Sequence, residues 1–385
     1  MTAAAVAGAA PGERTYQAAL AGALFLLGLF LPWSTAGTSL ALGLLLLVYL
    51  AAPRRAWAAT PWRDPLVAVG LVLLAWIGLR SLAASGWQEQ TLKAANQYHE
   101  LLLVPLVCAL VVLAQRRNAF LFGLMAGALG LALAHWLPLP AAVANKVELR
   151  RISAGFGLSL CAFLFYEEAR LRRLPRAVGC GAAAVLAATV LFGVHARTGH
   201  VVLLLLAACA AWRTAPLRWR WPALVSIVAA ALLIYAVLAN VREQRGDIAI
   251  SNRIRTELVQ NTVDIVRDHW LVGIGWAGFG KAYADAAAET GAPPDALWAH
   301  SSNPHNEFLM QAAGGGLPAL GLFAAWLGIP LVAAWRRRAT DAQAGVLACV
   351  ALAFAVGCAL NSLLLDFVEG HLYASLVAWL MAQRE

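Results

Sequence analysis

Charged residues are scarce in this chain of 385 residues: Asp, Glu, Lys and Arg make up 13% of it, while 61% is hydrophobic. A soluble globular domain carries about a quarter of its residues as charged side chains, which cover its surface. The shortage excludes a water-soluble domain of ordinary composition and predicts a protein surrounded by lipid.

Cysteine is also rare, and none occurs in the one long polar connection of the chain, residues 241–316. The six cysteines all lie in apolar segments: Cys108, Cys161, Cys180, Cys209, Cys349 and Cys358. Because disulfides form mainly in oxidising compartments outside the cytoplasm, an external loop without cysteine excludes a disulfide framework there. We interpret the cysteines as small apolar residues of membrane helices.

Several motifs that carry catalysis are missing. The chain has no G-x-x-x-x-G-K-[ST] loop for nucleotide phosphates, no H-E-x-x-H pair for zinc, and no D-x-D pair for a divalent metal. The run "GIGWAGFG" from Gly273 to Gly280 follows a helical pattern and not a strand, so we interpret it as a flexible or tightly turned loop. The sequence therefore predicts no cofactor and no metal, and no basic aromatic-rich helix suggests a nucleic-acid partner.

Long apolar runs recur along the whole chain, and about 20 such residues in a helix cross a bilayer core. Hydropathy predicts an all-α polytopic membrane protein with about twelve transmembrane helices. Nine of these helices are expected in residues 1–240 and three in 317–385, separated by a loop domain with helices at 241–316.

Arginine marks every second predicted connection, as the positive-inside rule requires of cytoplasmic loops. The basic connections contain Arg54 and Arg55, Arg116 and Arg117, Arg170 to Arg176, Arg213 to Arg220, and Arg336 to Arg338. This pattern predicts cytoplasmic termini and an external loop 241–316. It also explains most of the excess of 29 Lys and Arg over 20 Asp and Glu.

Cations gather on the outer side as well, where the positive-inside rule does not require them. Arg80 and Arg197 each lie at the outer end of a predicted span, where an ionisable side chain is costly and commonly functional. A single cation there could instead extend to the lipid headgroups. All eight histidines fall on the same side, and although a lone histidine is usually a hydrogen-bonding residue, together they suggest proton transfer near neutral pH. We interpret this side as a site for an anionic ligand.

Two stretches of the loop 241–316 carry its polar chemistry. Residues 252–270 predict a helix on the membrane surface, because Ile254, Leu258 and Ile265 recur near helical spacing. Arg255 then projects near the lipid headgroups and Arg253 from another face. The second stretch, "SSNPHNEFL" at residues 301–309, contains His305 beside Asn306 and Glu307.

Three stretches together resemble the O-antigen ligase and polymerase superfamily of bacterial envelopes. They are "HARTG" from His195, "RTELVQNTVDIVRDHWLVGIGWAGFG" from Arg255 and "PHNEFLMQAAGGGLPAL" from Pro304. The resemblance covers about residues 177–335. Trp270 stands where the family usually has proline, and Gly315 where an acidic residue is common.

The resemblance implies a GT-C-like helical bundle in the bacterial inner membrane, with its active site facing the periplasm. It also implies an enzyme that moves O-antigen polysaccharide from undecaprenyl diphosphate to the lipid A–core oligosaccharide, without a metal. Its partners would be the lipid-linked glycan donor, the lipid A–core acceptor and membrane lipid.

Roles follow for the residues that match or surround these motifs. Arginines would hold the diphosphate, because a guanidinium grips phosphate oxygens in pairs at any pH; these are Arg197 and Arg255 first, and Arg80, Arg151 and Arg253 second. His305 would act as general base on the acceptor hydroxyl, with inversion at the anomeric carbon. Acceptor-binding or orienting roles are expected for Asn306, Glu307, His300 and Asp366. If His305 is structural, the base would be His300, His195 or Glu307.

Other functions fit parts of the same pattern. A polysaccharide polymerase or a protein O-oligosaccharyltransferase uses the same donor chemistry, although the protein-directed enzymes tend to carry a larger outer domain. A lipid-linked glycan flippase or an anion transporter would also have many spans. A transporter is expected to show repeated halves and charges near the middle of the membrane, and the sequence shows neither.

Overall fold

The computed structural model describes residues 11–52, 60–138, 140, 150–194, 196–229, 247–291, 299–337 and 340–383. It is 81% helical and contains no strand within these residues, which confirms the all-α class. The helices are α2 (Pro11–Phe30), α3 (Thr35–Leu50), α5 (Pro65–Ser85), α6 (Glu89–Asn96), η1 (His99–Leu102), α7 (Leu103–Leu113), α8 (Ala119–Trp136), α10 (Arg151–Arg170), α11 (Arg176–Ala188), η2 (Thr189–Gly193), α12 (Arg197–Thr214), α14 (Asp247–Asp268), η3 (Trp276–Gly278), α15 (Phe279–Glu289), α16 (Glu307–Arg337), α17 (Ala342–Leu360) and α18 (Phe367–Ala382).

Several of these helices are long and apolar enough to cross a membrane. Five qualify: α5, α8, the segment Arg176–Gly193 formed by α11 and η2, α16 and α17. A sixth span results if α6 and the helical segment His99–Leu113, which are bent by 47°, are counted together. These helices support a multi-pass membrane protein. The expected count of about twelve stays a prediction, and the expected ninth span, residues 222–240, lies mostly outside the described residues.

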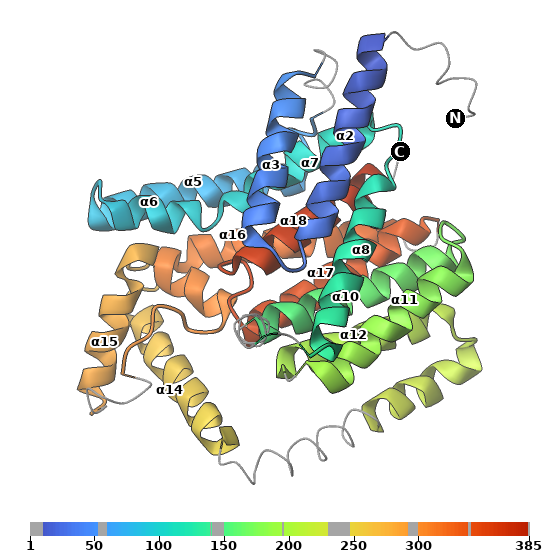
Figure 1. Ribbon diagram of the computed structural model, residues 1–385. Coiled ribbons are helices and arrows are strands. Elements are labelled where there is room, and N and C mark those ends of the chain that lie inside the picture. Colours follow the sequence, from blue (N-terminus) through green and yellow to red (C-terminus); the bar gives the residue numbers. More distant parts are fainter. Residues whose placement is uncertain are drawn as a thin grey trace.

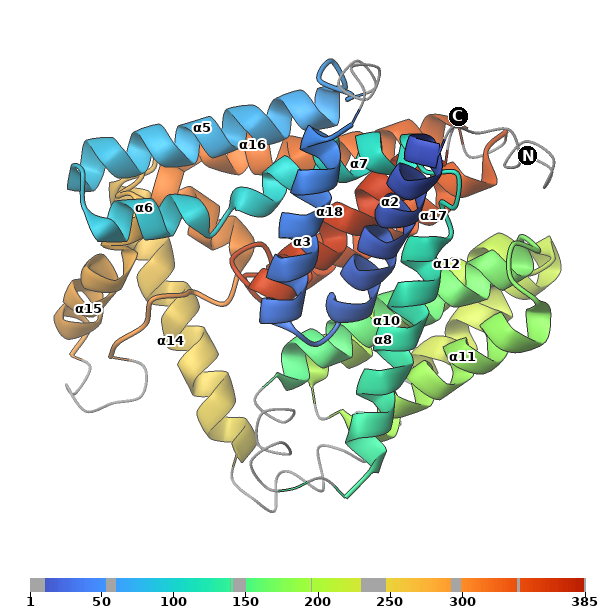
Figure 2. The same ribbon diagram turned by 45° about the horizontal axis from the view of Figure 1, so that its top comes forward.

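Helix α18 lies at the centre of the bundle. Nearly all of its residues are buried, and it packs against α7 and α17. Around it, α5 runs beside α16, α10 packs with α11 and α12, and α2 packs with α3 and α8 (Figures 1 and 2). Helices α14 and α15 lie at the edge of the bundle, where α14 contacts α16. The candidate site is built where this edge meets the ends of α12 and α17.

Two glycines bring α10 and α12 into close contact. Gly155 and Gly199 face each other, and a Cβ atom on Gly199 would lie 2.6 Å from the Cα atom of Gly155. The Ser159 hydroxyl, one turn further along α10, donates a hydrogen bond of 3.0 Å to the Gly199 carbonyl. Small residues allow membrane helices to approach in this way. The contact fixes the first turn of α12, which begins with Arg197.

Helix α16 is kinked near its start, and the kink receives the glycine-rich loop. Gly316 has φ 67°, a left-handed conformation that interrupts the helical hydrogen bonds. The carbonyls of Ala313 and Gly314 instead accept the N–H groups of Ile274 and Gly275, both at 2.8 Å. The run "GIGWAGFG" is thus a tightly turned loop packed on α16, one of the two forms predicted. The kink also falls at the expected boundary between residues 241–316 and 317–385.

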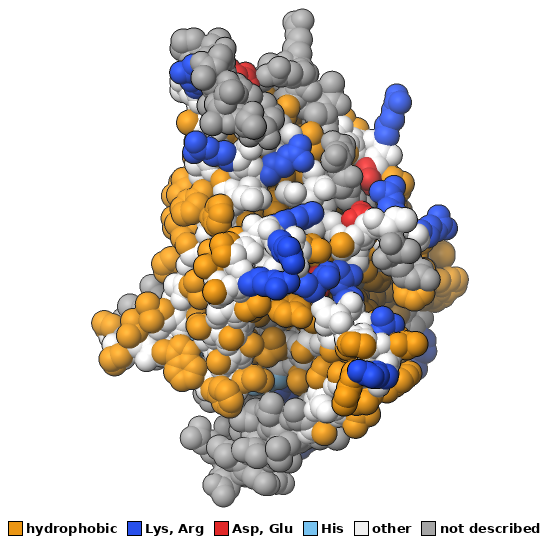
Figure 3. Space-filling view, turned by 90° about the vertical axis from the view of Figure 1, so that its right-hand side faces the viewer, with side chains coloured by type: hydrophobic (Ala, Val, Ile, Leu, Met, Phe, Trp, Pro, Cys, Tyr) orange, Lys and Arg blue, Asp and Glu red, His pale blue; other side chains and the backbone are white. Residues whose placement is uncertain are grey.

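Several arginines of the predicted basic connections, among those that the structure describes, lie at one end of the bundle. Figure 3 shows this face, on which Lys and Arg side chains gather and few acidic groups are visible. Two buried acids of α10 pair with part of this charge. Glu167 contacts Arg170 at 2.6 Å and Arg213 at 3.3 Å, and Glu168 lies 3.6 Å from Arg173. The arginines here are therefore partly structural, because they tie α10 to neighbouring segments.

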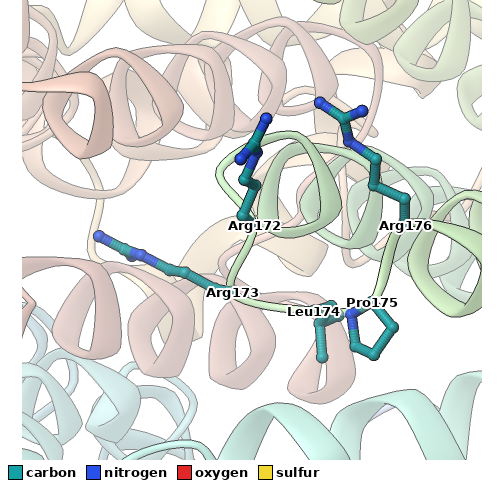
Figure 4. A pocket seen from close by; sticks show the side chains of 5 residues that line it. All are labelled: Arg172, Arg173, Leu174, Pro175 and Arg176. Atoms are coloured by element: carbon teal, nitrogen blue, oxygen red, sulfur yellow. The ribbon is translucent and has the colours of Figure 1, made fainter.

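The turn between α10 and α11 carries more of the same charge. It surrounds a hollow of about 470 Å³ lined by Arg172, Arg173, Leu174, Pro175 and Arg176. Arg172 and Arg176 point to the same side, whereas Arg173 points away (Figure 4). The Arg173 guanidinium donates a hydrogen bond of 2.7 Å to Gln343 in the first turn of α17. The turn thus joins α10 to α17 through Arg173.

Candidate active site

The loop before α16 presents His305 in an uncommon backbone conformation. Its φ of 51° lies in the left-handed region, which residues other than glycine, asparagine and aspartate rarely adopt. The His305 N–H donates to Asn303 Oδ1 at 2.8 Å, and the same oxygen accepts from the Ser362 hydroxyl at 2.6 Å. Pro304, between them, is buried. The backbone is therefore held in place, while the His305 side chain is partly buried and still reaches the surface.

Two other segments make polar contacts with the end of α17. The last carbonyls of a helix have no partner within it and must be satisfied from elsewhere. The Asn306 amide donates to the Ala359 carbonyl at 3.0 Å, and Arg255 Nη1 donates to the Leu360 carbonyl at 3.2 Å. The loop before α16 and the helix α14 thus both dock on the same helix end.

Asn361, the residue after α17, contacts α12. The Asn361 amide donates a hydrogen bond of 2.5 Å to the hydroxyl of Thr198, which follows Arg197. Three segments that are far apart in the sequence therefore meet at the end of α17: the start of α12, the middle of α14 and the loop with His305. These are also the three stretches on which the resemblance depends.

Three of the expected site residues interact electrostatically. Burial and the positive charge of Arg197 lower the pKa of Arg255. Partial burial and the charge of Arg255 lower the pKa of His305. A guanidinium stays protonated at neutral pH despite such a shift, whereas the imidazole becomes neutral. The arrangement places two permanent cations, suited to phosphate, next to an unprotonated proton acceptor.

Glu307, the first residue of α16, is fully buried and holds the neighbouring turn. Its carboxylate accepts the N–H groups of Leu364 and Leu365 at 3.1 and 3.2 Å, and it also accepts from Gln311 at 2.7 Å and the Tyr98 hydroxyl at 3.3 Å. A carboxylate with four donors inside the protein does not face an acceptor sugar. The geometry assigns Glu307 to holding the turn after α17, a role that the sequence did not predict.

Asp366 precedes α18 and lies on the far side of the same turn. Burial raises the pKa of its carboxyl to about 6. Its side chain makes no capping hydrogen bond to α18. A carboxyl with such a pKa changes its protonation in mildly acidic solution, and the expected contact of Asp366 with the acceptor stays a prediction.

Arg80 is placed differently from the expectation that it binds diphosphate. Its Nε and Nη2 atoms donate to the carbonyls of Val272 and Gly273, at 2.8 and 2.6 Å. These hydrogen bonds join α5 to the loop after α14. Arg80 therefore holds that loop, and its expected role in binding the diphosphate stays a prediction.

The remaining expected residues lie on the surface near the ends of their elements. Arg151 begins α10 and is exposed, Arg253 is exposed on α14 two residues before Arg255, and His300 is exposed in the loop that leads to His305. His195, from the "HARTG" stretch, lies outside the described residues. The structure thus brings together Arg197, Arg255, His305 and Asn306 and leaves these others at the periphery.

Four residues that position the site were not among those expected: Thr198, Asn303, Asn361 and Ser362. Each uses its side chain to connect two of the segments that meet at the end of α17. One signal for two of them exists in the sequence, since Asn361 and Ser362 form a polar pair between apolar runs. Their partners could not be read from the sequence, because the contacts span 59 and 163 positions along the chain.

Two of the eight histidines pair beneath this site. The Nε2 atoms of His99 and His371 lie 3.1 Å apart, and His371 stacks on Phe367. Glu369, two residues before His371, is also buried. No group of three or more His, Cys, Asp or Glu suited to holding a metal occurs in the part of the chain that the structure describes.

Comparison with known families supports the motif-based resemblance. Residues 182–324 match the family model described as O-antigen ligase. The matched region is a little more than a third of the chain and contains Arg197, Arg255 and His305. No curated protein matches the chain. The family match confirms the resemblance over α12, α14 and the first half of α16.

Proposed function

We propose that this protein, which contains an O-antigen ligase region at residues 182–324, is a glycosyltransferase. It transfers O-antigen polysaccharide from undecaprenyl diphosphate to the lipid A–core at the periplasmic face of the inner membrane. The observation that carries the proposal is the convergence of Arg197, Arg255 and His305 at the end of α17. A bundle of about twelve spans with GT-C-like architecture and cytoplasmic termini belongs to the same proposal.

The two arginines provide the donor site. The diphosphate of the donor carries negative charge, and this charge grows on the leaving oxygen as the glycosidic bond breaks. Guanidinium groups bind phosphate oxygens in a bidentate way and do not lose their proton. Arg255 is held by the Leu360 carbonyl at 3.2 Å through one nitrogen, so its other N–H groups can face a ligand.

His305 provides the base. The acceptor hydroxyl oxygen attacks the anomeric carbon, and the bond from that carbon to the phosphate oxygen breaks. His305 takes the hydroxyl proton, and the diphosphate leaves on its lipid. The lowered pKa of His305 keeps the imidazole neutral, which is the form that can accept a proton. One displacement of this kind inverts the anomeric centre.

A transfer assay with purified protein tests the proposal. The protein in detergent is given lipid-diphosphate-linked glycan and lipid A–core, without added metal, and the joined product is measured. Product formation is expected from the parent protein and loss of product from His305→Ala. Arg255→Lys tests the donor site in the same assay. Arg267→Lys is its matched control, because Arg267 lies on the same helix and pairs on the surface with Asp264 at 3.1 Å. An inactive parent protein with intact donor binding would contradict the proposal.

The acceptor distinguishes the related functions. A polymerase would join glycan to a second lipid-diphosphate-linked glycan, and a protein O-oligosaccharyltransferase would join it to a hydroxyl of a protein. The same assay with each acceptor in turn separates them. A flippase would give no covalent product with any acceptor but would move the donor across a vesicle membrane.

Reporter fusions test the orientation. A reporter fused after Arg173, in the turn between α10 and α11, should be active only in the cytoplasm. One fused after Gly291, behind α15, should be active only in the periplasm. A cytoplasmic signal from the Gly291 fusion would remove the site from the compartment where the donor is presented.

A further inference from the structure

A groove opens at the arginine-rich end of the bundle, between α12, α16 and α17. Its volume is about 740 Å³. The groove lies at the C-terminal end of α12, whereas Arg197 begins that helix, and 18 residues of helix span about 27 Å. The groove is therefore separate from the site around His305.

The walls of the groove are apolar. Leu331 and Val332 of α16 face it from one side, Ala348 and Leu352 of α17 from another, and Leu224 of the helical residues 217–229 closes it. Val332 remains 52% exposed although it belongs to a wall. Such a surface is covered by hydrocarbon when the helices lie in a bilayer.

The groove is lined by basic side chains and by no acidic side chain. The basic residues are Arg213 and Arg336. Arg213 forms an ion pair with Glu167 at 3.3 Å and donates a hydrogen bond of 3.1 Å to the Ala342 carbonyl. Arg336 is exposed and forms no ion pair with a described residue. The groove therefore presents Arg336 as its main unneutralised charge.

Tryptophans place the mouth of the groove at the level of the lipid headgroups. Trp212 and Trp335 line it and are 42% and 67% exposed. The guanidinium of Arg220 lies 5.2 Å from the centre of the Trp212 ring. Tryptophan and arginine are enriched in this way where a membrane protein meets the interface on its cytoplasmic side.

We propose that the groove binds an anionic glycerophospholipid of the cytoplasmic leaflet. An acyl chain lies against Leu331, Val332 and Leu352, and the phosphate is held by Arg336 with support from Arg213. The preference for an anionic over a zwitterionic headgroup follows from the all-positive lining, since each basic residue near a membrane surface attracts anionic lipid. This binding site goes beyond glycan transfer, and it rests only on the proposed orientation, which places this end of the bundle in the cytoplasmic leaflet.

Lipid binding to the detergent-purified protein tests the proposal. Retention of dioleoyl phosphatidylglycerol and of dioleoyl phosphatidylcholine is titrated by native mass spectrometry. The parent protein is expected to retain the anionic lipid more tightly. Arg336→Gln should weaken its retention by about fivefold, the effect of one basic residue near the membrane surface. Arg337→Gln is the matched control, since the neighbouring Arg337 is exposed but does not line the groove, and it should change retention little.

A second variant tests the apolar part of the groove. Val332→Trp adds bulk at an exposed wall position, so it should fold and reduce retention of the anionic lipid. Ala348→Phe, which fills the groove from α17, should give the same result if it folds. Equal retention of both lipids, equal losses in Arg336→Gln and Arg337→Gln, or unchanged retention in Val332→Trp would each overturn the proposal.

Discussion

The two ends of the bundle use arginine in opposite ways. At the end that holds the turn between α10 and α11, the buried Glu167 contacts Arg170 at 2.6 Å and Arg213 at 3.3 Å. At the candidate active site, the neighbours of Arg255 are a backbone carbonyl, the cation Arg197 and the imidazole of His305. Arg170 and Arg213 thus share a buried carboxylate, while Arg197 and Arg255 repel each other.

The contrast distinguishes arginines that are suited to binding an anion from arginines that stabilise the fold. Bringing two like charges together costs free energy, which a bound anion can return. Salt-bridged arginines instead contribute to stability, because a buried carboxylate without its partner is unfavourable. Substitutions at the candidate active site should therefore reduce transfer, and substitutions around Glu167 should reduce stability.

The largest effect is expected for His305→Asn. Asparagine tolerates the left-handed backbone that His305 adopts, so the loop should keep its structure while the base is lost. Transfer should slow by about 10²–10⁴, the usual contribution of a general base. The melting temperature and donor binding should change little. The rate of product formation, measured beside His269→Asn as a control at an exposed histidine directly after α14, tests this; a near-parent rate would make His305 structural.

The next largest effect is expected for Arg255→Lys. Lysine keeps the charge but cannot form the bidentate contact with phosphate. Loss of such a preorganised contact costs about 10²–10³ in rate. Transfer and donor affinity should both fall, whereas Arg267→Lys should behave like the parent. Full activity of Arg255→Lys would remove this arginine from the donor site.

The three motifs indicated which residues lie together at the end of α17 better than the positions of single arginines did. His305, Arg255 and Arg197 were expected from three short stretches, and the structure brings them together. Arg80 seemed equally suited at the end of a span, yet it holds the carbonyls of Val272 and Gly273. Hydropathy places a cation at a depth in the membrane and carries no information on which distant backbone it will meet.

The fold class was predictable for a similar reason. Apolar composition requires helices in lipid, because every backbone polar group needs a partner within the protein. The junction at the end of α17 was not predictable, since Asn361 contacts Thr198 across the bundle. Nor did hydropathy show that α16 begins at Glu307 and kinks at Gly316, because the expected span began only after the kink.

Glu167→Gln should lower the stability of the protein. The carboxylate is buried and pairs with Arg170 and Arg213, whose side chains are 31% and 19% exposed. Removing its charge leaves two partly buried guanidinium groups without their counterion, at a cost of about 1–3 kcal/mol. Thermal unfolding in detergent should occur at a lower temperature. The transfer rate per folded molecule should stay near that of the parent, and a specific loss of rate would break the contrast between the two ends.

The smallest expected effect is a shift in the pH dependence of transfer. His305 acts only when its imidazole is neutral, so kcat/KM should fall as the pH drops through the pKa of His305 in the free enzyme. Burial and the charge of Arg255 lower this pKa, which places the acidic limb below the ordinary histidine value of about 6.5. Replacing Arg255 with glutamine removes one of the two causes. The limb of the remaining activity should therefore move to higher pH.

Asp366, whose pKa is about 6, titrates in the same range and is a second source of an acidic limb. Asp366→Asn separates the two groups: if the limb disappears in Asp366→Asn and stays in place in Arg255→Gln, the aspartate and not His305 controls the pH dependence.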